Sequence, residues 1–258
     1  MALIAIAVYD TDENKRSSIT EKCLIQLRRT ITPSDKVGVY NNGSCVESSG
    51  NMDRLKQDGI VDYLYHGVEN IGTAKAVNHI WKRHMTPDGI KVKMDNDCFI
   101  HCHGWLEEAK EVFKRCPDIG IIGLKRIDVS EHPEAESLQY RSVLSFAMPN
   151  SPGYWIAVEE VHHVIGTCHV YRPELLENIG YLYQMNGLYG FDDFLMCRRS
   201  QLAGFRTVFL PHIRIDHLDE ITGYVQWKRA YAMDMMREFN KTAKGYQDGS
   251  IPIYYGGE

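Results

Sequence analysis

Ile90-Lys91-Val92-Lys93-Met94-Asp95-Asn96-Asp97 alternates apolar and polar residues as a β-strand does, and it ends in two carboxylates separated by one Asn. Side chains at i and i+2 of an extended segment point to the same side, so this strand end directs Asp95 and Asp97 into one space. Two like charges held together need a cation, and the hard ions Mg²⁺ and Mn²⁺, which also bind phosphate, suit them. An Asp/Asn turn that only closes a strand would have the same sequence.

Strands and helices alternate on both sides of this segment. Strand-like runs lie at 3–8, 36–40, 62–66, 90–94 and 119–124, and helix-like runs lie at 17–29, 73–84 and 105–115. Strands joined by helical crossovers predict an α/β fold with a mostly parallel central sheet flanked by helices. Ligands of such folds bind at the carboxyl ends of the strands, where Asp10, Asn41, Asn42 and the 95–97 segment fall.

The alternation breaks at 126–155, where three prolines interrupt polar sequence. Such a stretch is typical of an acceptor-binding excursion, a mobile lid or a plain surface loop. Beyond it the patterns predict a β-run at 159–171, helices after Pro173 and at 193–203, paired short strands at 207–209 and 213–217, and a helix at 221–244. We interpret the i, i+4 stripe of Trp227, Tyr231, Met235 and Phe239 as core packing. The Gly- and Tyr-rich tail at 245–258 is expected to be loosely held.

Length and composition predict one soluble domain. The chain has 258 residues, 44% of them hydrophobic, and a net charge of −5 without a block of like charge. This balance does not indicate a nucleic-acid or anionic-membrane partner. We divide the chain into a domain at 1–220, with a nucleotide-binding half at 1–124 and an acceptor half at 125–220, followed by a C-terminal helix and tail at 221–258.

No apolar run reaches the length of a membrane span, and the apolar start at 1–9 has no leading Lys or Arg, so we expect a cytoplasmic protein without a transmembrane segment. The seven cysteines are odd in number and scattered, which predicts free thiols. Cysteines and histidines gather at 98–103, but no second pair at zinc-site spacing follows, so buried thiols are the preferred interpretation there.

Four segments in their order resemble the inverting family 2 glycosyltransferases of the GT-A fold. They are the N-x-G-x-x-x-A-x-N pattern at 70–78, the Asp95-Asn96-Asp97 segment, the G-x-D-D segment at 190–193 with its trailing Arg and Gly, and the strand at 211–217 that ends in His217. Together they cover about residues 1–220, and their order is more specific than any one motif. The resemblance implies a GT-A domain and a hexosyltransferase-like enzyme of class EC 2.4.

A divalent ion, Mn²⁺ or Mg²⁺, would neutralise the leaving diphosphate of the sugar donor as a Lewis acid. Asp97 is the first candidate for its ligand, and Asp95 would contact the ion or the donor ribose. By resemblance, His217 lies over the diphosphate and is the third candidate ligand, since a neutral imidazole suits Mn²⁺. His212 is the alternative ligand.

Inversion needs a base that takes the proton of the acceptor hydroxyl. Asp193 occupies the position of the family's catalytic Asp, and Asp192 replaces the usual Glu, a shorter side chain with an acceptor or donor contact. Both acids also suit the start of a helix as an N-cap and a first-turn residue.

By resemblance, the donor nucleotide is expected to contact the ends of the first two strands and the segments around the D-x-D turn. The candidate donor-binding residues are Tyr9, Asp10, Thr11, Asn42, Asn70, Gly72, Asn78, Asp95 and Asn96. Many relatives have Asp where this chain has Asn42, whose amide both donates and accepts, so the base is left open. Asn70 and Gly72 also suit a simple helix-entry turn. Gly166, Cys168 and Arg172 resemble the strand under the donor sugar, and they also suit close packing.

The donor implied is a UDP-, dTDP- or GDP-sugar, and the acceptor is a glycan, a lipid-linked glycan, a protein or a modified nucleobase. Negative net charge disfavours duplex DNA as the acceptor. Two other hypotheses remain open. A nucleotidyltransferase of similar fold would use the same paired carboxylates, although no glycine-rich basic loop follows the first strand here. A nucleotide-sugar-binding module would have the site without turnover.

Overall fold

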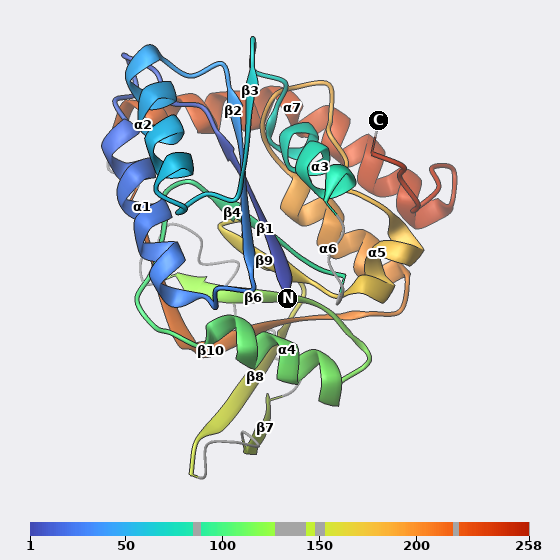
Figure 1. Cartoon of the computed structure of the whole chain (residues 1–258). Coiled ribbons are helices and arrows are strands. Elements are labelled where there is room, and N and C mark those ends of the chain that lie inside the picture. Colours follow the sequence, from blue (N-terminus) through green and yellow to red (C-terminus); the bar gives the residue numbers. More distant parts are fainter. Residues whose placement is uncertain (85–88, 127–142, 148–152, 219–221, 258) are drawn as a thin grey trace.

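The computed structural model describes residues 1–84, 89–126, 143–147, 153–218 and 222–257, with the backbone alone at 143–147 and 222–229. The first half contains β1 (Ala2–Val8), α1 (Ser17–Thr30), β2 (Lys36–Asn42), α2 (Val46–Gln57), β3 (Tyr63–Gly67), α3 (Thr73–Arg83), β4 (Ile90–Asp95), β5 (Cys98–Ile100), α4 (Trp105–Arg115) and β6 (Ile119–Arg126) (Figure 1). The second half contains β7 (Val143–Ala147), β8 (Trp155–Val161), β9 (Cys168–Tyr171), α5 (Pro173–Ile179), α6 (Asp192–Leu202), β10 (Arg206–His217) and α7 (Thr222–Asp248).

The described strands form one mixed sheet in the order β3-β2-β1-β4-β9-β6-β10-β8-β7, with β5 paired to β10. Strands β3, β2, β1 and β4 are parallel, as predicted for the first half. Strand β9 runs antiparallel between β4 and β6, and its first residue, Cys168, pairs with Met94. The start of β9 therefore lies beside the carboxyl end of β4, where the acidic pair stands.

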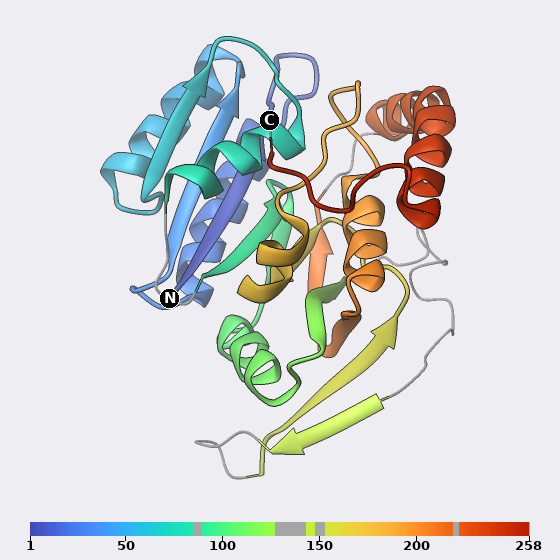
Figure 2. The same cartoon turned by 90° about the vertical axis from the view of Figure 1, so that its right-hand side faces the viewer.

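Helices cover both faces of the sheet, which confirms the predicted α/β architecture (Figure 2). One apolar cluster joins the sheet to α1, α2 and α4, and a second joins it to α3, α5 and α6. Strand β1 contributes to both clusters, because Ile4 and Ile6 point to one face and Leu3 and Ala5 to the other. A strand buried on both faces must be apolar at every position, which explains the continuous apolar run at the N-terminus.

Two predictions in the second half were wrong in detail. The expected β-run at 159–171 is two strands, β8 and β9, which pair with different neighbours. The expected pair at 207–209 and 213–217 is the single strand β10, whose pairing with β6 is interrupted between Leu210 and Arg214. Pro211 lies in this interruption and has no N–H for the ladder, which explains why the pattern resembled two strands.

The C-terminal tail is held in place, in contrast to the expectation. The Tyr255 N–H donates to Ile179 O at 2.9 Å, and the Tyr181 N–H donates to Tyr255 O at 2.8 Å. Gly180 has φ of +74°, and a Cβ there would lie 2.0 Å from Tyr255 O, so the absence of a side chain permits this approach.

The remaining predictions outside the site have mixed outcomes. Most of 126–155 lies outside the described residues, and within it β7 pairs antiparallel with the start of β8 (Figure 1). Of the predicted stripe, Met235 and Phe239 pack against the buried Met185, Leu195 and Tyr246, whereas the side chain of Trp227 is outside the described part. All seven cysteines are free, as predicted. Among the described helices, none combines the length and the apolar character that crossing a bilayer requires.

Candidate active site

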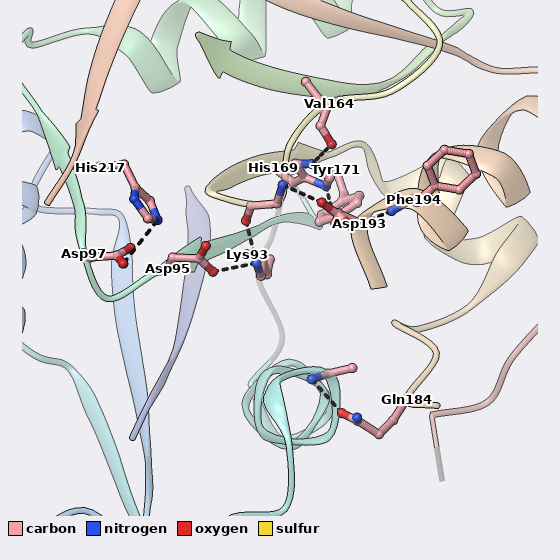
Figure 3. A network of polar contacts seen from close by, with 12 residues as sticks. Lys93, Asp95, Asp97, Val164, His169, Tyr171, Gln184, Asp193, Phe194 and His217 are labelled. Atoms are coloured by element: carbon pink, nitrogen blue, oxygen red, sulfur yellow. Dashed lines mark hydrogen bonds and ion pairs between the residues drawn. The ribbon is translucent and has the colours of Figure 1, made fainter. Parts of the chain in front are cut away.

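The two carboxylates that end strand β4 converge, as the i, i+2 spacing predicts. Side-chain atoms of Asp95, Asp97 and His217 lie within 4.8 Å of one another (Figure 3). His217 is the last residue of β10, which pairs antiparallel with β5 and so returns to the D-x-D turn. The pairing partner of His217 is Cys98, the residue after Asp97. Two distant segments thus bring an imidazole to the acidic pair.

Asp97 is the centre of this group. It is 2% exposed, its Oδ2 lies 3.2 Å from His217 Nε2, and the Arg16 guanidinium also donates to it. Two oxygen ligands and one imidazole nitrogen form a donor set that suits Mn²⁺. Two metal–ligand bonds of about 2.0 to 2.6 Å placed end to end span about 4 to 5 Å, so atoms that lie within 4.8 Å of one another can share one ion. The residues present therefore fit a divalent metal.

His212, the alternative ligand, does not lie in this group. Its Nε2 is 2.6 Å from Glu108 Oε2, and the Tyr154 hydroxyl donates to the other oxygen of the same carboxylate at 2.7 Å. Of the two candidate histidines, the structure brings His217 to the acidic pair.

Asn96, between the two carboxylates, points the opposite way into the protein. Its amide donates to Asp10 Oδ1 at 3.0 Å and to Thr20 Oγ1 at 2.7 Å. Asp10 is fully buried and also accepts from Ser48 Oγ at 2.8 Å, and burial raises the pKa of its carboxyl. These contacts fix the turn so that Asp95 and Asp97 lie together on its other side. The predicted nucleotide contacts of Asp10 and Asn96 remain predictions.

The other candidate donor-binding residues divide into buried and accessible ones. Asn42 is buried, and its amide faces the 71–72 backbone, accepting from Ile71 N at 3.3 Å. Asn78 exchanges two hydrogen bonds with the backbone of Leu182, at 2.8 and 3.1 Å, which ties α3 to the loop after α5. Tyr9 is 47% exposed at the end of β1 and is available to a ligand.

Thr11, Asn70 and Gly72 lie in turns. The Thr11 N–H donates to Asn14 Oδ1 at 2.9 Å, and Asn70 Oδ1 accepts from the Gly72 N–H at 2.9 Å. Gly72 has φ of +91° and precedes α3, so the helix-entry interpretation of this N-x-G describes its backbone well. Their contacts with a nucleotide remain predictions.

A strained turn presents the second acidic pair. Gly190 has φ of +107° and Phe191, the residue before α6, has φ of +60°. A non-glycine residue in this region costs on the order of 1 kcal/mol, and such residues cluster at functional sites. The stacked rings of Phe191 and Phe239, with centroids 4.4 Å apart, help to hold the turn. The turn places Asp192 and Asp193 in the first turn of α6, where the helix dipole favours negative charge.

Asp193 is held by backbone contacts, one of them with Phe194 (Figure 3), and by an imidazole. Its Oδ2 accepts from the Gly166 N–H at 2.9 Å and lies 3.4 Å from His163 Nε2, and its Oδ1 accepts from the Phe194 N–H at 2.7 Å. Burial raises the pKa of this carboxyl, but His163, with a contribution from Lys93, outweighs burial and holds the pKa well below its usual value. Asp193 is therefore ionised at neutral pH and can accept a proton.

Asp192 has the opposite character. Burial raises its pKa to about 6, with the charge of Asp193 acting in the same direction and Lys93 opposing it. Its Oδ2 has no hydrogen-bond partner among the described residues. Asp193 is thus ionised over the whole physiological range, whereas Asp192 is about half protonated near pH 6 and mostly ionised above pH 7.

Residues that the sequence analysis did not single out complete the site. Lys93 donates to Asp95 Oδ1 at 2.6 Å and to the Gly166 carbonyl. His169 lies under the acid pair, and its buried ring contacts Val164 O and the Tyr171 hydroxyl, each at 2.8 Å. Burial lowers the pKa of His169 to about 4, so this imidazole is neutral. The i, i+2 relationship of Lys93 to Asp95 was visible in the sequence, whereas the approach of Arg16, His163 and His169 depends on the fold.

A cavity of about 470 Å³ opens between α6 and α7, beginning at Phe194, the residue after Asp193. Phe194 and Phe239 are its aromatic residues, and Arg198 and Lys244 are its cations. Among the described residues that line it, none is acidic. An aromatic surface with polar and cationic groups is suited to a saccharide that bears a negative charge.

Solved structures of glycosyltransferases share this architecture. The mannosyltransferase PcManGT of Pyrobaculum calidifontis, in complex with GDP-Man and Mn²⁺, is 17% identical, with a TM-score of 0.69, and the match covers 94% of this chain and 64% of that one. S. aureus TarS 1-349 in complex with UDP-GlcNAc is 16% identical, with a TM-score of 0.59 and coverage of 85% and 61%. GalNAc-T7 with UDP, GalNAc and Mn²⁺ is 10% identical, with a TM-score of 0.61 and coverage of 84% and 43%.

These likenesses define the fold class as the GT-A glycosyltransferase fold. The chain spans less than two thirds of the length of each of these three proteins. No protein-family model and no curated protein matches the sequence.

Proposed function

We propose that this protein is a metal-dependent glycosyltransferase that moves a sugar from a nucleoside-diphosphate sugar to an acceptor hydroxyl with inversion. The observation that carries the proposal is the convergence of Asp95, Asp97 and His217 at the carboxyl edge of a GT-A sheet. A second acidic pair, at the start of α6, is joined to this group through Lys93 and Gly166. Nucleotide sugars are bound in two of the similar structures, as GDP-Man in PcManGT and UDP-GlcNAc in TarS.

Asp97, Asp95 and His217 would hold Mn²⁺ or Mg²⁺, which when bound neutralises the negative charge of the leaving diphosphate. Because Arg16 and His217 both reach Asp97 Oδ2, this carboxylate is oriented before a ligand arrives. A carboxylate with a fixed orientation loses little entropy when it binds a cation. Asn96 and Asp10 support the same geometry from inside the protein.

Asp193 acts as the base in this proposal. Its low pKa keeps it ionised, and its hydrogen bonds to Gly166 N–H and Phe194 N–H leave its orientation fixed. A carboxylate held within reach of the attacking hydroxyl accepts the proton as the bond to the anomeric carbon forms. Asp192, whose buried Oδ2 has no hydrogen-bond partner among the described residues, would bind a hydroxyl of the donor or acceptor sugar.

The proposed donor is a UDP-, dTDP- or GDP-sugar, and we propose that its nucleotide contacts the segments of Tyr9, Thr11, Asn42, Asn70 and Gly72. We place the acceptor in the cavity that begins at Phe194. The aromatic and polar lining of this cavity suits a glycan or a lipid-linked glycan. A net charge of −5 disfavours a duplex nucleic acid as the acceptor.

A thermal-shift panel of UDP, dTDP, GDP, CDP and their sugars, each with and without Mn²⁺, tests the proposal. A ligand that binds the native state raises its stability by mass action, so one nucleotide class should raise Tm only when Mn²⁺ is present. The nucleotide sugar identified is then incubated with acceptor glycans. Release of the nucleoside diphosphate supports the transferase, release of pyrophosphate indicates a nucleotidyltransferase, and binding without any turnover indicates a binding module.

A further inference from the structure

Lys93 is a charged residue in the middle of a buried strand. Its neighbours Val92 and Met94 are fully buried, and its own side chain is only 5% exposed. An ammonium group placed there is costly unless nearby groups compensate for its lost hydration. The partners that it has therefore indicate why a lysine occupies this position.

The contacts of Lys93 join the two acidic sites. Its Nζ donates to Asp95 Oδ1 at 2.6 Å and to the carbonyl of Gly166, and the N–H of the same Gly166 donates to Asp193 Oδ2 at 2.9 Å. A continuous path thus runs from the metal-binding group to the base (Figure 3). The path is closely packed, since a Cβ on Gly166 would lie 3.0 Å from Lys93 Nζ and 3.1 Å from Asp193 Cβ.

The charges around Lys93 have a second consequence. The carboxylates of Asp95, Asp192 and Asp193 all act electrostatically on its ammonium. Its one positive charge offsets part of their mutual repulsion, and it also opposes a cation that approaches Asp95. Lys93 thus stabilises the arrangement of the two acidic sites while it weakens the attraction of the first site for a metal ion.

We propose that Lys93 is a positioning residue, which fixes the base Asp193, through Gly166, relative to the metal ligand Asp95. This inference rests on the proposed function, which assigns the roles of base and metal ligand. The exchange experiment that tests it requires no sugar transfer. It predicts that loss of the lysine has opposite effects on two properties. Mn²⁺ should bind more tightly, because a competing positive charge is gone, whereas transfer should slow, because Asp193 loses its support.

The test compares Lys93→Met with Lys91→Met. Lys91 is on the same strand and the same face, and its Nζ donates to the carbonyls of Trp81 at 3.1 Å and His84 at 3.3 Å, away from the acidic sites. Hydrogen–deuterium exchange of the peptide that contains Gly166 reports whether the contact between Lys93 and Gly166 is intact, and it requires no enzymatic turnover. We expect at least about tenfold faster exchange in Lys93→Met, and parental exchange in Lys91→Met and Lys93→Arg.

Mn²⁺ titration and steady-state transfer complete the comparison. Lys93→Met should bind Mn²⁺ about threefold or more tightly. Its kcat should fall about 100-fold, as a misplaced catalytic group commonly causes. If the single variant does not fold, Lys93→Met combined with Asp192→Asn removes a carboxylate together with the lysine and is compared with Asp192→Asn alone.

If the Gly166 peptide exchanges at the same rate in Lys93→Met as in Lys91→Met, the inference is overturned. Weaker Mn²⁺ binding in Lys93→Met than in the parent would also overturn it. If the parent protein transfers no sugar, the proposed function fails, and the exchange result still decides the role of Lys93. If the parent binds no Mn²⁺, the exchange result alone decides it.

Discussion

His217 Nε2 lies 3.2 Å from Asp97 Oδ2, although the two residues are far apart in the sequence, one at the end of β10 and the other in the turn after β4. The contact exists because β10 continues past β6 and pairs with β5, directly after the D-x-D turn. An acidic pair at the end of one strand is thereby completed by a nitrogen ligand at the end of another. The metal-binding part of the proposal depends on this relationship.

Replacement of His217 should weaken metal binding. We expect His217→Ala to lower the affinity for Mn²⁺ by at least about tenfold, since even residues behind the ligands contribute that much at many metal sites. His212→Ala is the matched control, because His212 contacts Glu108 instead of the acidic pair. Isothermal titration with Mn²⁺ measures both variants. Equal losses in the two variants would contradict the assignment of the ligand.

Replacement of Asp193 should abolish transfer without abolishing donor binding. Asparagine keeps the size of the side chain and can still accept the Gly166 N–H, but it cannot take a proton at neutral pH. Asp193→Asn should therefore lower kcat by about 10² to 10⁴-fold, the range of general base catalysis. Donor affinity, measured by titration with the nucleotide sugar, should stay near that of the parent. Undiminished turnover would indicate that another group is the base.

The raised pKa of Asp192 predicts a pH-dependent stability difference. Burial raises this pKa from 3.8 to about 6, so the folded protein holds the proton more tightly than the unfolded chain. Between about pH 4 and pH 6 the folded state keeps a proton that the unfolded state has lost, and stability therefore falls as the pH rises through this window.

Asp192→Asn removes this effect. At pH 7.5 the variant should be more stable than the parent by about 2 kcal/mol, a figure reduced for the partial exposure of the group. The difference should shrink near pH 4.5. Urea unfolding at the two pH values measures it, and a difference that does not change with pH would show that the pKa is not raised.

Arg199 should be essential for stability, unlike its neighbour Arg198. Arg199 is fully buried and donates to the carbonyls of Ile179, Tyr181 and Ile253, which ties the C-terminal tail to α5 and α6. Arg199→Met leaves these carbonyls without their donor and should cost about 3 kcal/mol or more. Arg198→Met, in the cavity lining, should change stability by less than about 0.5 kcal/mol. Unfolding of both variants in urea tests the contrast, and equal stability would refute it.

Much of the architecture was predictable because apolar periodicity determines which segments are strands and helices. The prediction for β4 was good, since alternation along 90–97 determines both the strand and the side to which Asp95 and Asp97 point. The prediction for β10 failed where Pro211 interrupts the pairing within one strand. Helix α2 was not predicted, because its polar sequence buries only Ser48, Met52 and Leu55.

The site was predictable to the extent that its residues are neighbours in sequence. Asp95 with Asp97, and Asp192 with Asp193, are visible as pairs. Contacts such as Arg16 with Asp97 and His163 with Asp193 depend on loops whose course no local pattern determines. The tail was misjudged for the same reason, because its backbone hydrogen bonds to residues 179 and 181 require the fold.

The central claim is that Asp95, Asp97 and His217 bind a divalent ion that in turn binds a diphosphate. Crystals soaked in Mn²⁺ and the nucleotide selected by thermal shift allow the ion to be located from its anomalous scattering. We predict one anomalous peak between these three side chains, with the diphosphate oxygens completing its coordination. Nucleotide bound without a peak there, or a peak at another position with Asp97 still paired to Arg16 and His217, would contradict the account.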